Sequence, residues 1–308
     1  MGTTYSVKVV SDSPVDVLAL QAEIQAVVDR INGLMSNWVE TSDLSRFNRH
    51  QDTTSLEIDP ETAGVIRLAL NLAQETSGSF DPTVSPLIEL WGFGTKKREG
   101  FPEASEVERI RELYGWEKLV LEGNQLRKTQ PTLNLNLGAI AKGYAVDAVA
   151  DHLAGLGFQR YMVEIGGEVR TSGSSARGVP WRIGIEDPRS DGSRKIYKVA
   201  NLSGKAMATS GDYRIFFTHE GQVFSHILDP RSGYPIPRRT ASVSVIADDC
   251  ATADALATAF MIPEPAACIE LVENRPDLEC MILEYGENDE LKISKSSGFD
   301  RYLSSPAP

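Results

Sequence analysis

The sequence has little cysteine, no run of basic residues and no long apolar stretch. Its three cysteines, Cys250, Cys268 and Cys280, cannot all pair and include no Cys-x-x-Cys spacing, which argues against a disulfide framework and a zinc site. The formal net charge is −12, so nucleic acid and anionic membranes are poor candidates for the main partner. No segment has the roughly 20 apolar residues of a transmembrane helix. The only low-complexity segment is a short tail near 304–308, which we expect to be disordered.

What remains is the composition of a globular protein. The chain has 308 residues, of which 41% are hydrophobic and 24% charged, enough to bury a full core. Strand patterns dominate its second half, and glycine-containing turns are frequent. We therefore predict an α+β fold in one domain over residues 1–308, with mixed, largely antiparallel sheets flanked by helices. The patterns predict helices at 13–34, with Ser13 as the cap, and at 60–77, 104–114, 139–153, around 254 and at 265–273. They predict strands at 3–10, two strands around a turn at 122–124 of which the second is 132–137, and strands near 160–165, 168–173, 181–186, 195–200, 213–218, 222–228, 240–247, 279–284 and 290–294.

The segment Ala-Asp-Ala-Leu-Ala-Thr at 253–258 is the most informative feature. Its alanine content predicts a helix, and the spacing of four residues places Asp254 and Thr258 on one helix face. A carboxylate and a hydroxyl are hard oxygen donors of the kind that magnesium prefers. The structural alternative is that Asp254 favours the helix dipole and Thr258 bonds back within the helix.

A second segment, residues 136–144, carries a strand end, a glycine turn and a helix start. Gly138 ends the predicted strand, and Lys142 lies in the first turn of the predicted helix, where backbone N–H groups attract anions. The spacing matches neither a Walker A loop nor a dinucleotide fingerprint. Lys142 is either a phosphate-binding cation or a solvated helix lysine.

Among the four histidines, His226 differs because it lies in an apolar strand followed by a polar turn that begins at Asp229. An imidazole in that place is either a core group or a general base. The sequence contains no Gly-x-Ser-x-Gly elbow and no His-Glu-x-x-His motif, so triad hydrolases and zinc proteases are poor interpretations.

The order of the motifs resembles one family over nearly the whole chain. Met-Ser at 35–36, Leu-Ser-Arg-Phe-Asn at 44–48, Gly-Ser-Phe-Asp-Pro-Thr-Val at 78–84 and Leu-Gly-Ala-Ile-Ala-Lys-Gly-Tyr at 137–144 come first. Ile-Gly-Gly at 165–167, Ala-Thr-Ser-Gly-Asp-Tyr at 208–213, Ser-His-Ile-Leu-Asp-Pro at 225–230 and the motif at 253–258 follow. This pattern resembles the FAD:protein FMN transferases, also called ApbE-like flavin transferases, which implies an ApbE-like, T-fold-related core.

The resemblance also implies a magnesium-dependent enzyme that transfers FMN from FAD, its substrate, to a threonine of another protein. Carried over by position, the metal ligands are Asp254, Thr258 and the carbonyl of Ala139. The residues lining FAD are Met35, Ser79, Phe80, Asp81, Lys142 and Leu228, with Asn136 where the family commonly has an aspartate. For the chemistry we expect Asp254 to hold the metal, Lys142 to add a positive charge and His226, or Asp229 in its place, to accept the threonine proton.

The implied partner is an acceptor protein with an Asp-Gly-x-Thr motif. This chain has Asp-Gly-Ser-Arg at 191–194, so we expect it to be the modifier rather than the modified protein. Family members are often exported lipoproteins, which implies a periplasmic enzyme on the inner membrane, held by a lipid anchor outside this chain. The rival interpretations are a metal-dependent FAD pyrophosphatase, which gives FMN and AMP, and an FAD-binding carrier or sensor without turnover.

Overall fold

A computed structural model describes residues 2–94, 98, 100–189, 195–212, 216–219, 222–237, 239–287 and 290–304. Most of the predicted tail and the segment 191–194 therefore lie outside the described residues. The chain divides into two compact units. Apart from Met1, the first comprises Asp29–Ala141 and Ile215–Arg238, and the second comprises Gly2–Val28, Lys142–Arg214 and Arg239–Pro308. A single domain over 1–308 stays a prediction.

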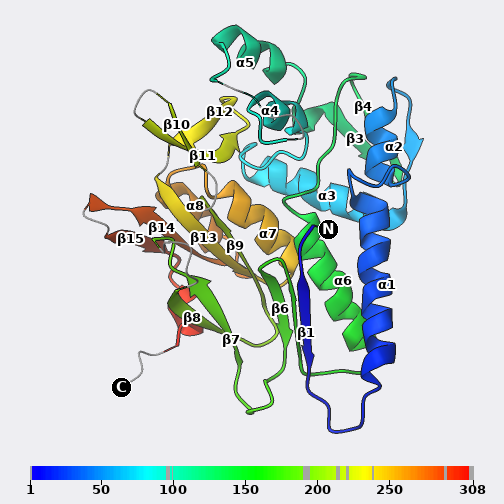
Figure 1. Cartoon of the computed structure of the whole chain (residues 1–308), viewed down its shortest axis with the longest axis vertical. Coiled ribbons are helices and arrows are strands. Elements are labelled where there is room, and N and C mark those ends of the chain that lie inside the picture. The colour runs from blue at the N-terminus through cyan, green and yellow to red at the C-terminus, as the bar shows by residue number, and fades with distance from the viewer. Residues whose placement is uncertain are drawn as a thin grey trace. The chain divides into compact units, whose positions relative to one another are not determined.

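The second unit is built on a seven-stranded sheet in which every neighbouring pair is antiparallel (Figure 1). The strand order is β1-β5-β6-β9-β13-β14-β15, so the first and the last strand of the chain form the two edges of one sheet. The turn between β5 and β6 contains Gly166 and Gly167 at φ values of 68° and 110°, where side chains are disfavoured. The strands are β1 (Tyr5–Val9), β5 (Tyr161–Ile165), β6 (Glu168–Ser172), β9 (Ala206–Gly211), β13 (Thr240–Ala247), β14 (Glu279–Tyr285) and β15 (Leu291–Lys295).

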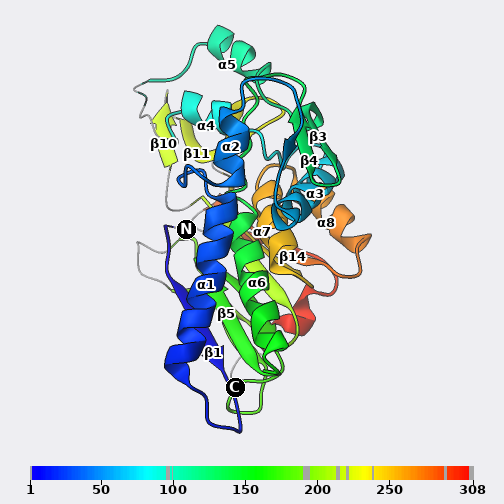
Figure 2. The same cartoon turned by 90° about the vertical axis from the view of Figure 1, so that its right-hand side faces the viewer.

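Helices and a hairpin complete this unit. Helix α7 (Cys250–Ala259) packs on β9 and β13, and α8 (Pro265–Glu273) on β14 and β15. Figure 2 shows α6 (Ala141–Gly155) beside α1 (Val17–Met35), of which the residues up to Val28 belong to this unit. His152 contacts Glu23 there, with 3.0 Å between Nε2 and Oε2.

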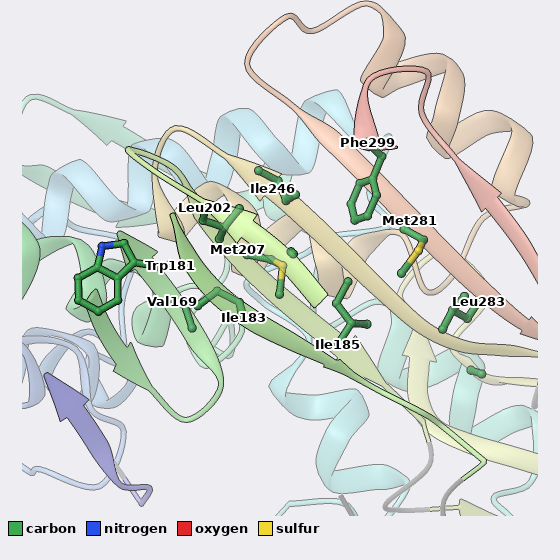
Figure 3. Packing of buried hydrophobic residues seen from close by; sticks show 12 residues of the cluster. Val169, Trp181, Ile183, Ile185, Leu202, Met207, Ile246, Met281, Leu283 and Phe299 are labelled. Atoms are coloured by element: carbon green, nitrogen blue, oxygen red, sulfur yellow. The ribbon is translucent and has the colours of Figure 1, made fainter. Parts of the chain in front are cut away.

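The hairpin of β7 (Trp181–Glu186) and β8 (Ile196–Leu202) closes a hydrophobic core with the large sheet (Figure 3). Met281 and Leu283 alternate along β14 and both join this core, as does Phe299 of the 3₁₀ turn Phe299–Tyr302. The sheet is therefore covered by packed side chains on the face where the hairpin lies.

The first unit combines short helices with two small sheets. Its helices are α2 (Asp43–Arg49), α3 (Pro60–Glu75), α4 (Ser85–Leu90) and α5 (Ala104–Arg111), followed by the 3₁₀ turn Trp116–Lys118. One sheet has the order β2-β4-β3 and the other β10-β11-β12. The strands are β2 (Leu56–Glu57), β3 (Leu119–Glu122), β4 (Gln125–Lys128), β10 (Phe216–His219), β11 (Gln222–Asp229) and β12 (Tyr234–Pro237). Within the described residues, none of the helices combines the length and apolar character that a membrane span needs.

The α+β prediction agrees with this architecture, but several elements differ from the patterns. Ser13 does not cap the first helix, because that helix begins at Val17 and Asp16 accepts the N–H groups of Leu18 and Ala19, both at 3.1 Å. The predicted strand at 132–137 is wrong. Its leucines alternate into the core as expected, but the segment pairs with no strand. The strand after the turn at 122–124 is β4, at Gln125–Lys128, and the predictions also missed α2, α4, β2, β9 and β12.

Candidate functional site

Helix α7 presents Asp254, and two acids fix the start of that helix. Asp249 is the N-cap, and its carboxylate accepts the N–H of Thr252 at 2.7 Å. Asp147, from α6, accepts the N–H groups of Cys250 and Ala251 at 2.9 Å. Burial raises the pKa of the Asp147 carboxyl to about 6, against the opposing effect of these donors and of the Arg170 guanidinium. The backbone donors left open at the start of α7 are thus satisfied by side chains.

Helices α6 and α7 approach so closely that only glycine fits at 143. A Cβ added to Gly143 would lie 2.3 Å from the carbonyl oxygen of Cys250 and 2.8 Å from the Cα of Ala251. The Gly143 N–H donates to Asp254 Oδ2 at 3.0 Å. This contact joins the first turn of α6 to the candidate metal ligand.

We expect Gly143→Ala to lower the melting temperature, because the added methyl group would push α6 and α7 apart. Overpacking of this kind costs about 1–3 kcal/mol. Gly155→Ala is the matched control: Gly155 ends the same helix, nothing lies within 4 Å of its added Cβ, and alanine favours helices. Thermal unfolding followed by circular dichroism compares the two variants, and equal melting temperatures would contradict the close approach.

Lys142, Asp254 and Glu168 form one charged cluster. Lys142 Nζ lies 3.2 Å from both carboxylate oxygens of Asp254 and 3.5 Å from Glu168 Oε1. The Asp254 and Glu168 side chains are 4% and 7% exposed, but Lys142 is 32% exposed, so a ligand can reach the cation. Two buried carboxylates thus face one accessible ammonium group.

The pKa values in this cluster follow from burial and charge. Burial by itself lowers the pKa of Lys142, but the Asp254 and Glu168 carboxylates outweigh it, so the pKa lies above its ordinary value. Burial raises the pKa of Glu168 to about 7, although the Lys142 ammonium opposes that shift. Lys142 is therefore a fixed positive charge at neutral pH.

Thr258 lies one turn beyond Asp254 on α7, as the spacing predicts. Its hydroxyl oxygen is 3.2 Å from the hydroxyl oxygen of Ser210, on β9. The hydroxyl thus has a partner outside its own helix, which does not support the alternative of an internal helix bond alone.

The residues of this cluster fit a divalent cation of the magnesium type. No group of three or more His, Cys, Asp or Glu side chains in the described part of the chain is arranged to hold a metal. Magnesium, however, needs few protein ligands when substrate phosphates and waters complete its shell. The Lys142 ammonium already places a positive charge on both Asp254 oxygens, and Asp254 and Thr258 offer only hard oxygen donors.

Part of the predicted FAD-lining set comes together in the first unit. The Asn136 N–H donates to the Pro82 carbonyl at 2.6 Å, which places Asn136 beside the motif that contains Asp81. Asp81 accepts from the N–H and hydroxyl of Thr83 at 2.7 and 2.6 Å and from the Trp116 N–H at 3.2 Å. Burial nevertheless raises the pKa of the Asp81 carboxyl.

A cavity of about 600 Å³ is lined by Asp81 together with Gly78, Tyr114 and Arg231. Ser79 and Phe80, beside Asp81, are both buried at 3% exposure, and Ser79 Oγ has no hydrogen-bond partner among the described residues. A cavity of this size is in the range of small-molecule pockets.

The remaining predicted site residues of the first unit lie on separate elements. Met35 is buried at the end of α1, and Ala139 lies in the turn before α6. Leu228 lies on β11 and packs against the cluster around Trp91. No described hydrogen bond or ion pair joins these three to Asp81 or Asn136.

His226 and Asp229 both lie on β11, but their surroundings differ. The His226 ring meets Phe93 edge to face, with 6.3 Å between ring centroids. The Asp229 carboxylate is held by the Arg231 guanidinium at 2.9 and 3.1 Å. The guanidinium thus occupies both oxygens of the Asp229 carboxylate, which favours His226 as the base.

Sequence reasoning missed three residues that contact Lys142, the start of α7 or Thr258, namely Glu168, Asp147 and Ser210. Each acts on a residue distant in sequence, so helix and strand periodicity carries no signal for it. The local sequence gave no signal for Glu168, since an acid that follows a glycine turn is ordinarily exposed.

Comparison with known proteins gives a consistent result. The sequence matches the ApbE family over residues 1–282. The FAD:protein FMN transferase of Vibrio cholerae is 40% identical over 306 residues, covering 99% of this chain and 91% of the relative. That of Haemophilus influenzae is 40% identical over 281 residues, covering 89% and 81%. The solved structure of the flavin transferase ApbE from Vibrio cholerae has a TM-score of 0.88 at 38% identity and covers 98% of this chain and 96% of that chain.

Proposed function

This chain belongs to the ApbE family, and on that premise we propose that the cluster of Lys142, Asp254 and Thr258 holds the phosphates of FAD together with Mg²⁺. The predicted family, fold class and enzyme class are confirmed. The chain is an FAD:protein FMN transferase, an enzyme that moves FMN from FAD to an acceptor protein. The observation that carries the proposal is the accessible Lys142 ammonium held between two buried carboxylates.

In the proposed reaction the acceptor is a threonine hydroxyl. Its oxygen attacks the FMN-side phosphorus of FAD, a new phosphoester bond forms, and the bond from that phosphorus to the bridging oxygen breaks. AMP leaves with the electron pair of that bond. The charge that grows on the AMP phosphate must be stabilised, and Lys142 supplies a positive charge that stays protonated.

Asp254, Thr258 and the carbonyl of Ala139 would hold the cation. A cation held there would supply positive charge to the diphosphate and so help the AMP phosphate to leave. The Gly143 N–H keeps one Asp254 oxygen in place, and Ser210 does the same for the Thr258 hydroxyl. His226 takes the proton of the attacking hydroxyl.

Asp81, Ser79, Phe80, Asn136, Met35 and Leu228 are the proposed FAD-lining residues. In support, Asp81 lines a cavity, and a hydrogen bond of the Asn136 N–H holds Asn136 beside the Asp81 motif. An amide at 136 accepts and donates hydrogen bonds but brings no charge.

The acceptor is proposed to carry an Asp-Gly-x-Thr motif. It is proposed to meet the enzyme in the periplasm, where a lipid anchor would tether the enzyme to the inner membrane. Purified enzyme should be incubated with FAD, Mg²⁺ and a protein containing that motif. Intact-mass spectrometry should then show one added FMN on the acceptor, and a Thr→Ala acceptor should stay unmodified.

The same incubation separates the two rival activities. Free FMN and AMP with an unmodified acceptor would indicate a pyrophosphatase. FAD recovered intact after long incubation with Mg²⁺ would indicate a carrier or sensor. Only the added mass on the acceptor supports flavin transfer.

A further inference from the structure

Glu168 contacts Lys142 beside the proposed metal site, but it is neither a proposed ligand nor a group that acts in the proposed chemistry. Its side chain is 7% exposed, and its Oε2 has no hydrogen-bond partner among the described residues. A buried carboxylate with one unpaired oxygen costs free energy. We therefore expect that in some state of the protein a donor pairs with Glu168 Oε2.

The partner that lies nearest is Lys142, whose Nζ is 3.5 Å from Glu168 Oε1. The same ammonium lies 3.2 Å from both oxygens of Asp254. Lys142 thus contacts both oxygens of Asp254, the carboxylate that the proposed cation would also bind. A cation bound at Asp254 repels the ammonium at this distance, so both cannot keep the same oxygens.

We infer that Lys142 and the divalent cation compete for Asp254, and that Glu168 is the positioning residue that receives Lys142 when the cation binds. The inference rests on the cation site proposed at Asp254. Moving the ammonium from Asp254 toward Glu168 would complete the hydrogen bonding of Oε2. It would also keep the lysine in the site, available to a phosphate, instead of releasing it to solvent.

Geometry supports this transfer because both carboxylates already contact the same nitrogen. Glu168 opens β6 directly after the glycine turn, and Asp254 is fixed by the Gly143 N–H at 3.0 Å. The ammonium therefore already lies within 3.5 Å of both carboxylates before it changes partners.

The test is a Mn²⁺ titration of the full chain without nucleotide, in which electron paramagnetic resonance measures free Mn²⁺. Glu168→Gln should weaken Mn²⁺ binding about tenfold, as for other residues that orient metal sites indirectly. Lys142→Met should strengthen binding, because the competing ammonium is removed. In the Lys142→Met background, Glu168→Gln should change the affinity by less than about threefold, since residues acting through one another are not additive.

Two results would overturn the inference. One is a Glu168→Gln variant that binds Mn²⁺ like the unmodified protein. The other is an equal loss in both backgrounds, which would make Glu168 a direct ligand or a simple source of negative charge. Glu164→Gln is the matched control, because Glu164 lies on the preceding strand and accepts the Gly167 N–H at 2.8 Å without contacting the cluster.

Further variants separate folding and the proposed function from this inference. Glu168→Asp keeps the charge but shortens the side chain, so it should weaken binding in the same direction, and thermal melting without metal reports its folding. Asp254→Asn should abolish the Mn²⁺ site. If the site survives in Asp254→Asn, the proposed metal site itself is wrong. If it is lost while both Glu168 variants bind normally, only the role of Glu168 is wrong.

Discussion

Replacing Asp254 with asparagine is expected to reduce flavin transfer by roughly 10³-fold or more, because the proposed cation site loses the one charged side chain among its proposed ligands. Asparagine keeps the volume of the buried side chain and can still accept the Gly143 N–H, so the contact between α6 and α7 survives. The loss then reports charge rather than packing. Single-turnover transfer to the acceptor, followed by mass spectrometry, measures it.

Asp249→Asn is the matched control for this experiment. Asp249 is the N-cap of α7, and asparagine is an equally good N-cap. This variant therefore removes one negative charge next to α7 and leaves the proposed ligand Asp254 unchanged. We expect its transfer rate to stay within about twofold of the unmodified protein, as for a conservative change away from the site. Chelation of Mg²⁺ with EDTA should reproduce the Asp254→Asn loss. Efficient transfer by Asp254→Asn without metal would contradict the proposed site.

Helix α7, which carries the proposed cation ligands, was predictable because its information is local. Alanine content predicted α7, and the spacing of four residues placed Asp254 and Thr258 on one face. The segment 132–137 shows the limit of such reasoning. Its alternating leucines predicted the buried face correctly, but periodicity does not reveal whether a partner strand exists. Side-chain bonds from Asn48 satisfy the backbone of Leu135 instead, at 2.7 and 2.9 Å.

Short elements and long-range pairs explain the other differences. Helices α2 and α4 have seven and six residues, too few for helical periodicity to be recognised. Gly143 was predicted to be near an anion-binding turn, but the structure gives a further reason for glycine, the close approach of α7. Glu168 meets Lys142 only because the turn at Gly166 and Gly167 folds β6 back along β5. Such a pairing depends on the fold and leaves no mark in the local sequence.

His226→Ala is expected to leave FAD binding nearly unchanged and to slow transfer by about 10²–10⁴-fold, the range for removal of a general base. The threonine hydroxyl must lose its proton as it attacks, and without an acceptor for that proton the attack has a higher barrier. FAD affinity from fluorescence quenching and single-turnover rates separate binding from chemistry. Added imidazole should restore part of the rate, because a small base can enter the space left by the side chain.

Asp229→Asn distinguishes the two candidate bases on β11. Because the Arg231 guanidinium holds the Asp229 carboxylate at 2.9 and 3.1 Å, that carboxylate is already engaged, and its loss should slow transfer much less than the loss of His226. A general base accepts a proton only when it is unprotonated, so the transfer rate of the unmodified enzyme should fall toward acid pH. If His226 is the base, this fall should be absent in His226→Ala but present in Asp229→Asn. The reverse pattern would assign the proton to Asp229. An unaltered pH–rate profile in both variants would exclude both residues as the base and leave water or the phosphate itself to take the proton.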